Sequence, residues 1–200
     1  LRPLLFYPIS SGSLPARASP HGCGPRVGSG GSVFWGLLLA VTVGACSSGD
    51  DGGGGEEPVD SDYTYVANSH SYDISAYLIN PTTGALTAVA GSPFPVGQYY
   101  FTSVAVHPAG KFIYVSDSMT NNVAAFRIIP ATGALATITS SPFPAGSYPN
   151  AVAVHPSGKF AYVANGTSSD VSAFAVDSST GALTELGGSP YPAGNFPVSM

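Results

Sequence analysis

The segment HPAGKFIYVSD, residues 107–117, joins a tight turn to an apolar strand. Pro108 sets its own φ angle in the turn, and Gly110 accepts the positive φ that such a hairpin requires. The second half of the segment is a run of β-branched and aromatic residues of strand length. A closely similar segment, HPSGKFAYVAN, occupies residues 155–165. The chain therefore contains a repeated hairpin.

The sequence around this hairpin repeats as well, at spacings of 49 and 48 residues. The recurring motifs are YVAN or YVSD beginning at Tyr65, Tyr114 and Tyr162, TGAL beginning at Thr83, Thr132 and Thr180, and Ser-Pro-Phe or Ser-Pro-Tyr beginning at Ser92, Ser141 and Ser189. One extra residue lies near Phe101. Periods of about 20–50 residues are typical of repeat proteins built from stacked units.

The second repeat predicts four strands, at residues 103–107, 112–117, 122–129 and 134–139, with a linker over 141–148. Several of these strands are apolar on both faces, as expected when each sheet is stacked between two others. Four short strands in a repeat of about 48 residues are typical of a β-propeller blade. We predict an all-β fold of four-stranded antiparallel blades.

The composition agrees with this fold and excludes one class of partner. Hydrophobic types make up 44% of the chain, which is too apolar for a disordered protein. The chain has 6 Lys and Arg against 11 Asp and Glu, a net charge of −5. It lacks the basic surface that holds a phosphate backbone, so we expect no nucleic-acid partner.

Residues 1–45 are interpreted as a signal peptide with an N-terminal extension. Their apolar run, residues 33–45, is shorter than the roughly 20 residues that span a bilayer. Val43-Gly44-Ala45-Cys46 resembles the lipobox of bacterial lipoproteins, which implies lipidation of Cys46. An uncleaved anchor or a chance apolar run remains the alternative.

Residues 46–61 are rich in Gly and acidic side chains, and they predict a flexible tether after the lipidated cysteine. We therefore expect an extracytoplasmic lipoprotein that is attached to a membrane by its lipid, at the outer membrane or the cell surface. Cleavage before Cys46 would remove Cys23, and lipidation would occupy the thiol of Cys46, so cysteine-metal chemistry is not available. We expect no metal ion and no other cofactor.

We expect residues 62–200 to form an incomplete propeller, with repeats near 63–101, 102–149 and 150–200. The segment 155–165, followed by VSAF and STGAL, resembles the YVTN-type propellers of the lactonase-like family, which includes 6-phosphogluconolactonase-like enzymes. This resemblance implies a propeller of seven blades, of which about three are present. The first repeat begins at its second strand, with no first strand directly before it.

The loops at one end of the blades, here called the top face, are where propellers bind ligands. A catalytic residue is needed once, so residues that recur in each repeat, such as His107 and His155, are interpreted as structural. The candidate ligand contacts interrupt the repeat and are His70, Tyr99, Tyr100 and Phe101. Ordinary loop variation around packing aromatics such as Tyr148 is the alternative. Arg127 is interpreted as a strand-edge residue on an outer face.

Two functions of different class remain open. The first is a surface-anchored binding or scaffold module whose ligand is a glycan, a lactone or an envelope protein. The second is a lactone hydrolase whose catalytic residues lie in other blades. Lactone hydrolysis needs a base or metal to activate water and a donor for the oxyanion. The sequence supplies no such set, and no catalytic residue of the family carries over to a position of this chain.

Overall fold

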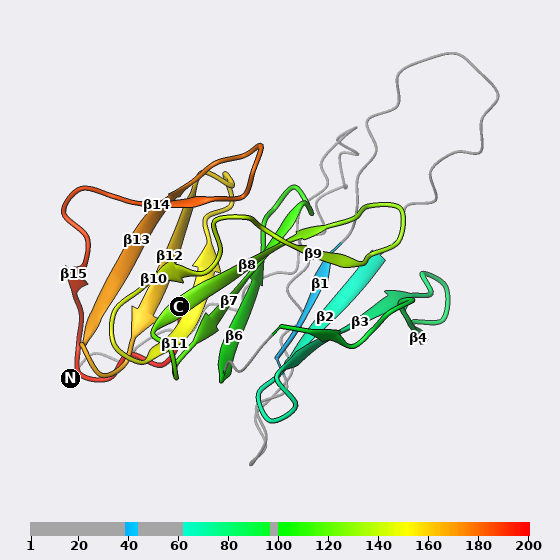
Figure 1. Cartoon of the computed structure of the whole chain (residues 1–200), viewed down its shortest axis with the longest axis horizontal. Helices are drawn as coiled ribbons and strands as arrows, with labels where there is room; N and C mark the ends of the chain where they lie inside the picture. The colour runs from blue at the N-terminus through cyan, green and yellow to red at the C-terminus, as the bar shows by residue number, and fades with distance from the viewer. Residues whose placement is uncertain (1–38, 44–61, 97–99) are drawn as a thin grey trace, which may run out of the picture.

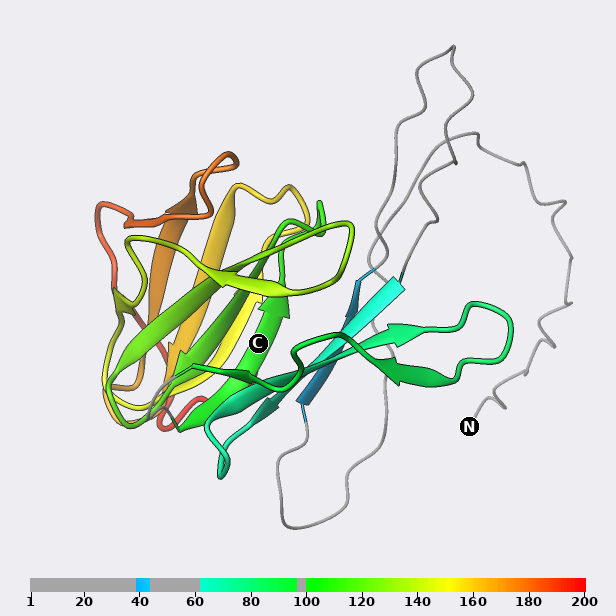
Figure 2. The same ribbon diagram turned by 45° about the vertical axis from the view of Figure 1, so that its right-hand side comes forward.

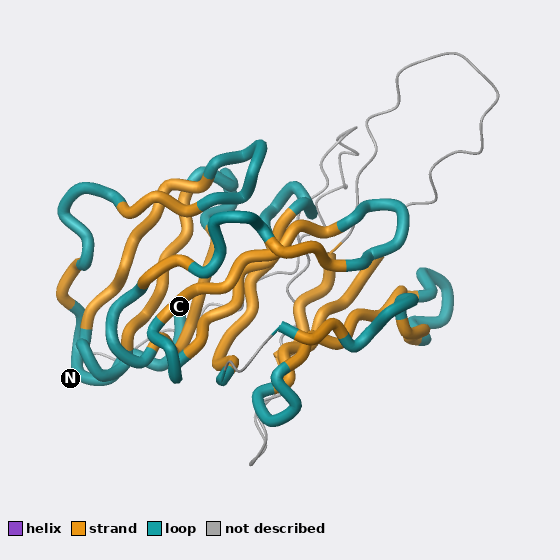
Figure 3. The backbone as a smooth tube through the Cα atoms, in the orientation of Figure 1, coloured by secondary structure: helices purple, strands orange, loops and turns teal. Residues whose placement is uncertain are grey.

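The computed structural model describes residues 39–43, 62–96 and 100–200. Within these ranges every regular element is a strand, and Figure 3 shows only strands and loops. The strands form three antiparallel sheets. Figure 1 shows these sheets side by side in chain order, with the third sheet on the left and the first on the right, and the turned view of Figure 2 keeps this order. The all-β prediction is confirmed.

Each sheet contains three long strands and two short ones. The first sheet consists of β1 (Leu39–Val43), β2 (Asp62–Asn68), β3 (Asp73–Ile79), β4 (Leu86–Ala88) and β5 (Phe94–Pro95). The second consists of β6 (Phe101–Val106), β7 (Phe112–Asp117), β8 (Asn122–Ile128), β9 (Leu135–Thr137) and β10 (Phe143–Pro144). The third consists of β11 (Pro149–Val154), β12 (Phe160–Asn165), β13 (Asp170–Val176), β14 (Leu183–Glu185) and β15 (Tyr191–Pro192).

The turn between β6 and β7 has the conformation that its sequence predicts. Gly110 has a φ of 67°, and its backbone N–H donates to the carbonyl oxygen of His107 at 2.8 Å. The His107 N–H donates in turn to the carbonyl oxygen of Phe112 at 2.8 Å, which closes the hairpin. Local turn chemistry therefore sets this strand register.

The outer edge of each sheet differs from the prediction, because two short segments replace one continuous fourth strand. In the second sheet β9 and β10 both pair with β8, and β10 lies in the stretch that was predicted as a linker. Between them the Ser141 hydroxyl oxygen accepts the Ala125 N–H at 2.8 Å. Ser92 and Ser189 accept the equivalent N–H groups in the other sheets. The recurring serine thus satisfies a strand donor where the fourth strand is interrupted.

The first repeat was expected to begin at its second strand, but β1 occupies the place of a first strand in this sheet. β1 pairs antiparallel with β2 along its whole length, from Leu39 opposite Ala67 to Val43 opposite Tyr63. An unpaired strand edge leaves backbone groups without partners, and β1 satisfies them. β1 belongs to the apolar run that was interpreted as part of a signal peptide, so cleavage before Cys46 would remove it.

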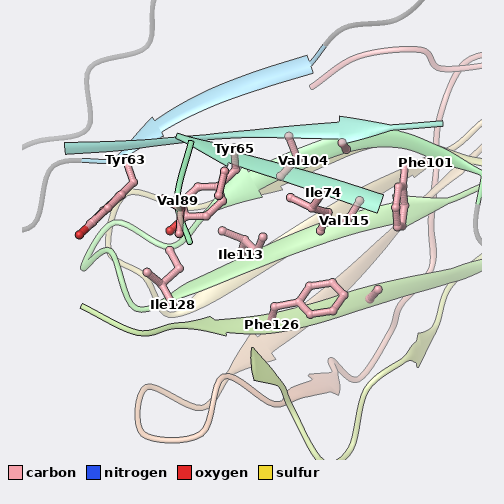
Figure 4. Packing of buried hydrophobic residues seen from close by; sticks show 13 residues of the cluster. Tyr63, Tyr65, Ile74, Val89, Phe101, Val104, Ile113, Val115, Phe126 and Ile128 are labelled. Atoms are coloured by element: carbon pink, nitrogen blue, oxygen red, sulfur yellow. The ribbon is translucent and has the colours of Figure 1, made fainter. Parts of the chain in front are cut away.

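The core lies between the sheets because side chains on successive strand residues point to opposite faces. From β7, Ile113 and Val115 pack toward the first sheet, beside Tyr65 and Ile74 (Figure 4). The neighbouring residues of β7 pack toward the third sheet, in a second cluster that includes Phe112, Tyr114, Val163 and Phe174. Full burial of each such side chain stabilises the fold by about 1.5–3 kcal/mol. The middle sheet is therefore covered on both faces.

Candidate functional site

Two sets of loops meet at one end of the sheets and form the top face. One set follows the second strand of each sheet, at residues 69–72, 118–121 and 166–169, and the other set leads into the next sheet. The Tyr148 N–H donates to the Asn121 side-chain oxygen at 2.8 Å, and the Ser147 N–H donates to the Ser168 hydroxyl at 3.0 Å. These contacts hold loops of neighbouring sheets together.

The last residue of each second strand supports these loops. Asp117 is fully buried, and one of its carboxylate oxygens accepts the N–H of Tyr100 at 2.8 Å and that of Met119 at 3.0 Å. The Thr120 hydroxyl donates to its other oxygen. In the third sheet the Asn165 amide donates to the Asp170 carboxylate at 2.7 Å. Asp117 therefore caps its loop, whereas the Asn165 side chain bonds to the adjacent strand β13.

His70 and Tyr100 meet at the top face as an exposed aromatic pair. Their ring centroids lie 6.0 Å apart, with an interplanar angle of 59°. The His70 Nδ1 lies 3.1 Å from the Ser69 hydroxyl, and Tyr100 is 37% exposed. No carboxylate among the described residues contacts the imidazole. This pair offers a stacking surface and one titratable ring.

Phe101 does not join this pair. It is 2% exposed and packs in the cluster between the first and second sheets, where Figure 4 shows it near Val115. As the first residue of β6 it pairs with Asp117, whereas Tyr100 lies just before the strand. Of the other predicted site residues, Tyr99 and Cys46 lie outside the described residues.

A second exposed aromatic pair was missed at the sequence level. Tyr148 and Phe196 are 41% and 53% exposed, and their ring centroids lie 5.9 Å apart. The strand register explains why Tyr148 was misread as a packing residue. Pro149 pairs with Asn165 as Phe101 pairs with Asp117, so Tyr148 is the equivalent of Tyr100. The extra residue of the first repeat therefore lies before Tyr100, which conceals this equivalence in the sequence.

The backbone at the second pair is unusual. Tyr148 and Phe196 have φ angles of 60° and 51°. Bulky side chains rarely adopt this left-handed conformation, and it occurs where surrounding contacts enforce it. Here the Asn121 side chain and the Ser169 hydroxyl accept the two N–H groups, at 2.8 Å and 3.4 Å. The loops therefore hold both rings in place on the surface.

The recurring histidines are remote from this face, in the turns at the opposite end of the blades. His107 is buried, its Nε2 lies 3.0 Å from the carbonyl oxygen of Gly158, and its Nδ1 accepts the Ala109 N–H. Burial is the main cause that lowers the pKa of His107, against the raising effect of the Gly158 bond. Its interpretation as a structural residue is confirmed.

Within the ranges that the structure describes, no three His, Cys, Asp or Glu side chains are grouped so that they could hold a metal ion. In the same ranges no helix meets the length and hydropathy needed to cross a membrane.

Antiparallel sheets that stack face to face in chain order, each about 48 residues after the last, are the blades of a β-propeller. The chain belongs to the lactonase family of seven-bladed β-propellers, whose family model matches residues 59–196. The resemblance inferred from the sequence is therefore confirmed. A comparison with curated proteins found no match.

Solved structures of similar fold include a proposed 6-phosphogluconolactonase from Bacteroides fragilis, with a TM-score of 0.61 and 22% identity over 68% of this chain and 37% of that one. A proposed 6-phosphogluconolactonase from Bacteroides uniformis has a TM-score of 0.61 and 21% identity, over 68% and 38%. The periplasmic gluconolactonase of Pseudomonas aeruginosa has a TM-score of 0.55 and 22% identity, over 68% and 40%. These likenesses establish the fold, and this chain spans about two fifths of those chains.

Proposed function

We propose that the top face binds a sugar-like ring, such as a sugar lactone, by stacking against its two aromatic pairs. The observation that carries this proposal is the exposure of Tyr100, Tyr148 and Phe196 in a fold that otherwise places most aromatic strand residues between its sheets. Aromatic faces bind the apolar faces of ligand rings, and a few polar groups then fix the orientation.

Lactone hydrolysis is the second candidate function, and family membership favours it. The reaction requires a group that activates water and a donor for the oxyanion. Among the described residues His70 is the only histidine at the top face, and no carboxylate contacts its ring. A hydrolytic reaction would therefore draw its remaining groups from residues outside those described.

Attachment to a membrane is a separate part of the proposal. A lipid on Cys46 and the tether of residues 46–61 would hold the blades outside the cytoplasm, where the protein could also serve as a scaffold for envelope partners. The support is the lipobox-like sequence before Cys46. Detergent-phase partitioning of the expressed protein tests it, since Cys46→Ala should remain in the aqueous phase. Equal partitioning of both proteins would refute the anchor.

Calorimetry with glucono-1,5-lactone and with a neutral oligosaccharide tests the binding site. Combined replacement of Tyr148 and Phe196 by Ala should weaken binding by about 1–3 kcal/mol, as expected for aromatic anchors. Met119→Ala is the matched control, because Met119 is 60% exposed on a top-face loop and has no aromatic ring. Unchanged affinity in the double variant would remove the proposed site.

Hydrolysis is measured separately, as the rate of lactone opening above the uncatalysed rate between pH 5 and pH 9. His70→Ala should abolish catalysis if the imidazole is the general base. Catalysis that survives in His70→Ala would assign this role to another group. Binding without any catalysis would support the ring-binding function and would contradict the hydrolase function.

A further inference from the structure

A groove of about 550 Å³ lies between the second and third sheets, away from the top face. It is bordered by Arg127 of β8, by residues 136–140 and by Ser179 and Thr180 of the β13–β14 turn. This turn is at the opposite end of β13 from the top-face loops. The groove is therefore distinct from the site proposed above.

The strand register places Arg127 on one wall of this groove. Arg127 pairs with Phe112 on one side and with Ala136 on the other, so the three side chains share a face of the second sheet. Phe112 on that face packs in the cluster shared with the third sheet. Arg127 therefore faces the next blade, and its expected position on an outer face is wrong.

The Arg127 guanidinium has no partner in the part of the chain that the structure describes. It is exposed and makes no hydrogen bond or ion pair there. A guanidinium presents several N–H donors in a planar fork, which matches the two oxygens of a carboxylate. One wall of the groove thus carries an uncompensated positive charge on a chain whose net charge is −5.

The opposite wall carries hydroxyl groups in a fixed turn. The Asp177 carboxylate accepts the Ser179 N–H at 2.8 Å, the Ser179 hydroxyl at 2.6 Å and the Thr180 N–H at 2.9 Å. These hydrogen bonds, led by that of the Ser179 hydroxyl, lower the pKa of Asp177 to about 2. Asp177 itself does not border the groove, and these three bonds stay within its own turn. Its charge therefore orders the two hydroxyl residues.

The equivalent position between the first and second sheets has no charged side chain and fewer hydroxyl groups, with Leu78 and Thr87 on one wall and Ala131 and Thr132 in the facing turn. Leu78 pairs with Tyr63 as Arg127 pairs with Phe112, so Leu78 takes the place of the arginine. In the facing turn Ala131 stands where the third sheet has Ser179. Both walls of the groove between the second and third sheets are therefore more polar than those of the equivalent position, although the fold of the repeat does not require this difference.

We infer that this groove binds a sugar ring that carries a carboxylate, as in a hexuronic acid. Arg127 holds the carboxylate, while Ser179, Thr180 and Ser140 are within the lining and can bond ring hydroxyls. Ala136, which is half-buried in the lining, gives the ring an apolar surface. The volume is within the range of about 300–1,000 Å³ that small-molecule sites occupy. The ligand is either a free hexuronate or one unit of an acidic polysaccharide.

Calorimetry on the full chain with galacturonate, trigalacturonate and neutral galactose tests this site. We expect galacturonate to bind and galactose to bind at least about tenfold more weakly, since the charged fork contact is lost. Tighter binding of trigalacturonate than of the monomer would assign the groove to a polysaccharide. Equal binding would assign it to the free sugar acid.

Arg127→Leu places the residue of the first sheet in the second, and it should reduce galacturonate affinity at least about tenfold. Arg127→Lys keeps the charge without the fork and should lose affinity too, which covers a failure of the leucine variant to fold. Lys159→Ala is the control, because it removes one positive charge that does not border the groove. Wild-type protein that does not distinguish galacturonate from galactose, or Arg127 variants that bind galacturonate like wild type, would overturn the inference.

Discussion

The phenolic hydroxyl of Tyr114 donates a 3.0 Å hydrogen bond to the carbonyl oxygen of Gly181 in the next blade. The same bond, at 2.8 Å, joins Tyr65 to Gly133 one blade earlier. A Cβ on Gly181 would lie 2.5 Å from the Phe112 ring, so the glycine allows the turn to approach the neighbouring sheet closely. Two motifs that recur in the sequence, YV and TGAL, therefore meet across each pair of blades.

Removal of this hydroxyl should weaken the contact between blades. Tyr114→Phe leaves the ring in place and removes the donor to a buried carbonyl, so we expect a loss of about 1 kcal/mol in the free energy of unfolding. Tyr162→Phe is the matched control, because Tyr162 is the equivalent residue and its hydroxyl has no partner in the described ranges. Chemical denaturation measures both. An equal loss in the two variants would contradict the proposed contact.

Stability should depend on pH through His107. Burial lowers the pKa of His107 in the folded protein, so the unfolded chain binds a proton that the folded chain does not. The stabilising contribution is present above the unfolded pKa of about 6.5, and it is lost as the pH falls through the lowered folded value. Denaturation at several pH values from 8 to 5 should show this loss.

His107→Gln should flatten this pH dependence, since the glutamine amide does not titrate. His155→Gln is the control, because His155 occupies the equivalent turn and is exposed. A pH profile that His107→Gln leaves unchanged would show that another group causes the loss.

Replacement of Tyr100 and of Phe101 by Ala should affect different properties of the protein. Phe101 is buried between two sheets, so its truncation should cost about 3–5 kcal/mol of stability. Tyr100 is exposed, so its truncation should change stability by about 0.5 kcal/mol or less and should weaken ligand binding instead. Thermal unfolding and calorimetry separate the two effects. A stability loss at Tyr100 that matches the loss at Phe101 would contradict this division.

The buried Asp117 should influence ligand binding indirectly, because it holds the backbone at Tyr100. Asp117→Ala leaves the N–H groups of Tyr100 and Met119 without their acceptor, at a cost of about 1–3 kcal/mol in stability. We also expect weaker lactone binding, because the backbone at Tyr100 is no longer held. Asp117→Asn keeps an acceptor oxygen and should restore most of the affinity. Full affinity in the Ala variant would show that the loop is held by other contacts.

The edge strand β1 should prevent self-association of the first sheet. A chain of residues 62–200 exposes the edge of β2, and unpaired edges join readily with other chains. We expect it to form larger species as its concentration rises, as light scattering would measure. A chain of residues 39–200 retains β1 and should scatter less. Identical scattering by the two chains would show that β1 does not protect this edge.

The hairpins, the strand lengths and the repeat could be predicted from the sequence because short-range chemistry controls them. Gly110 lies at the turn position that needs a positive φ, and the apolar run that follows has the length of one strand. The recurrence of these features every 48 or 49 residues was sufficient to predict the blade and the family. The split of the outer strand was not visible, because it depends on a serine that reaches across to β8.

The site depended on which face of a sheet each side chain occupies, and only the tertiary structure decides this. Tyr100 and Phe101 are adjacent and both aromatic, yet Tyr100 is exposed just before β6 begins and Phe101 is buried as its first residue. The position of Arg127 beside the third sheet likewise follows from its pairing with Phe112 and from the packing of the next blade. Sequence determined the repeating unit, and the stacking of the units determined which side chains solvent and ligands can reach.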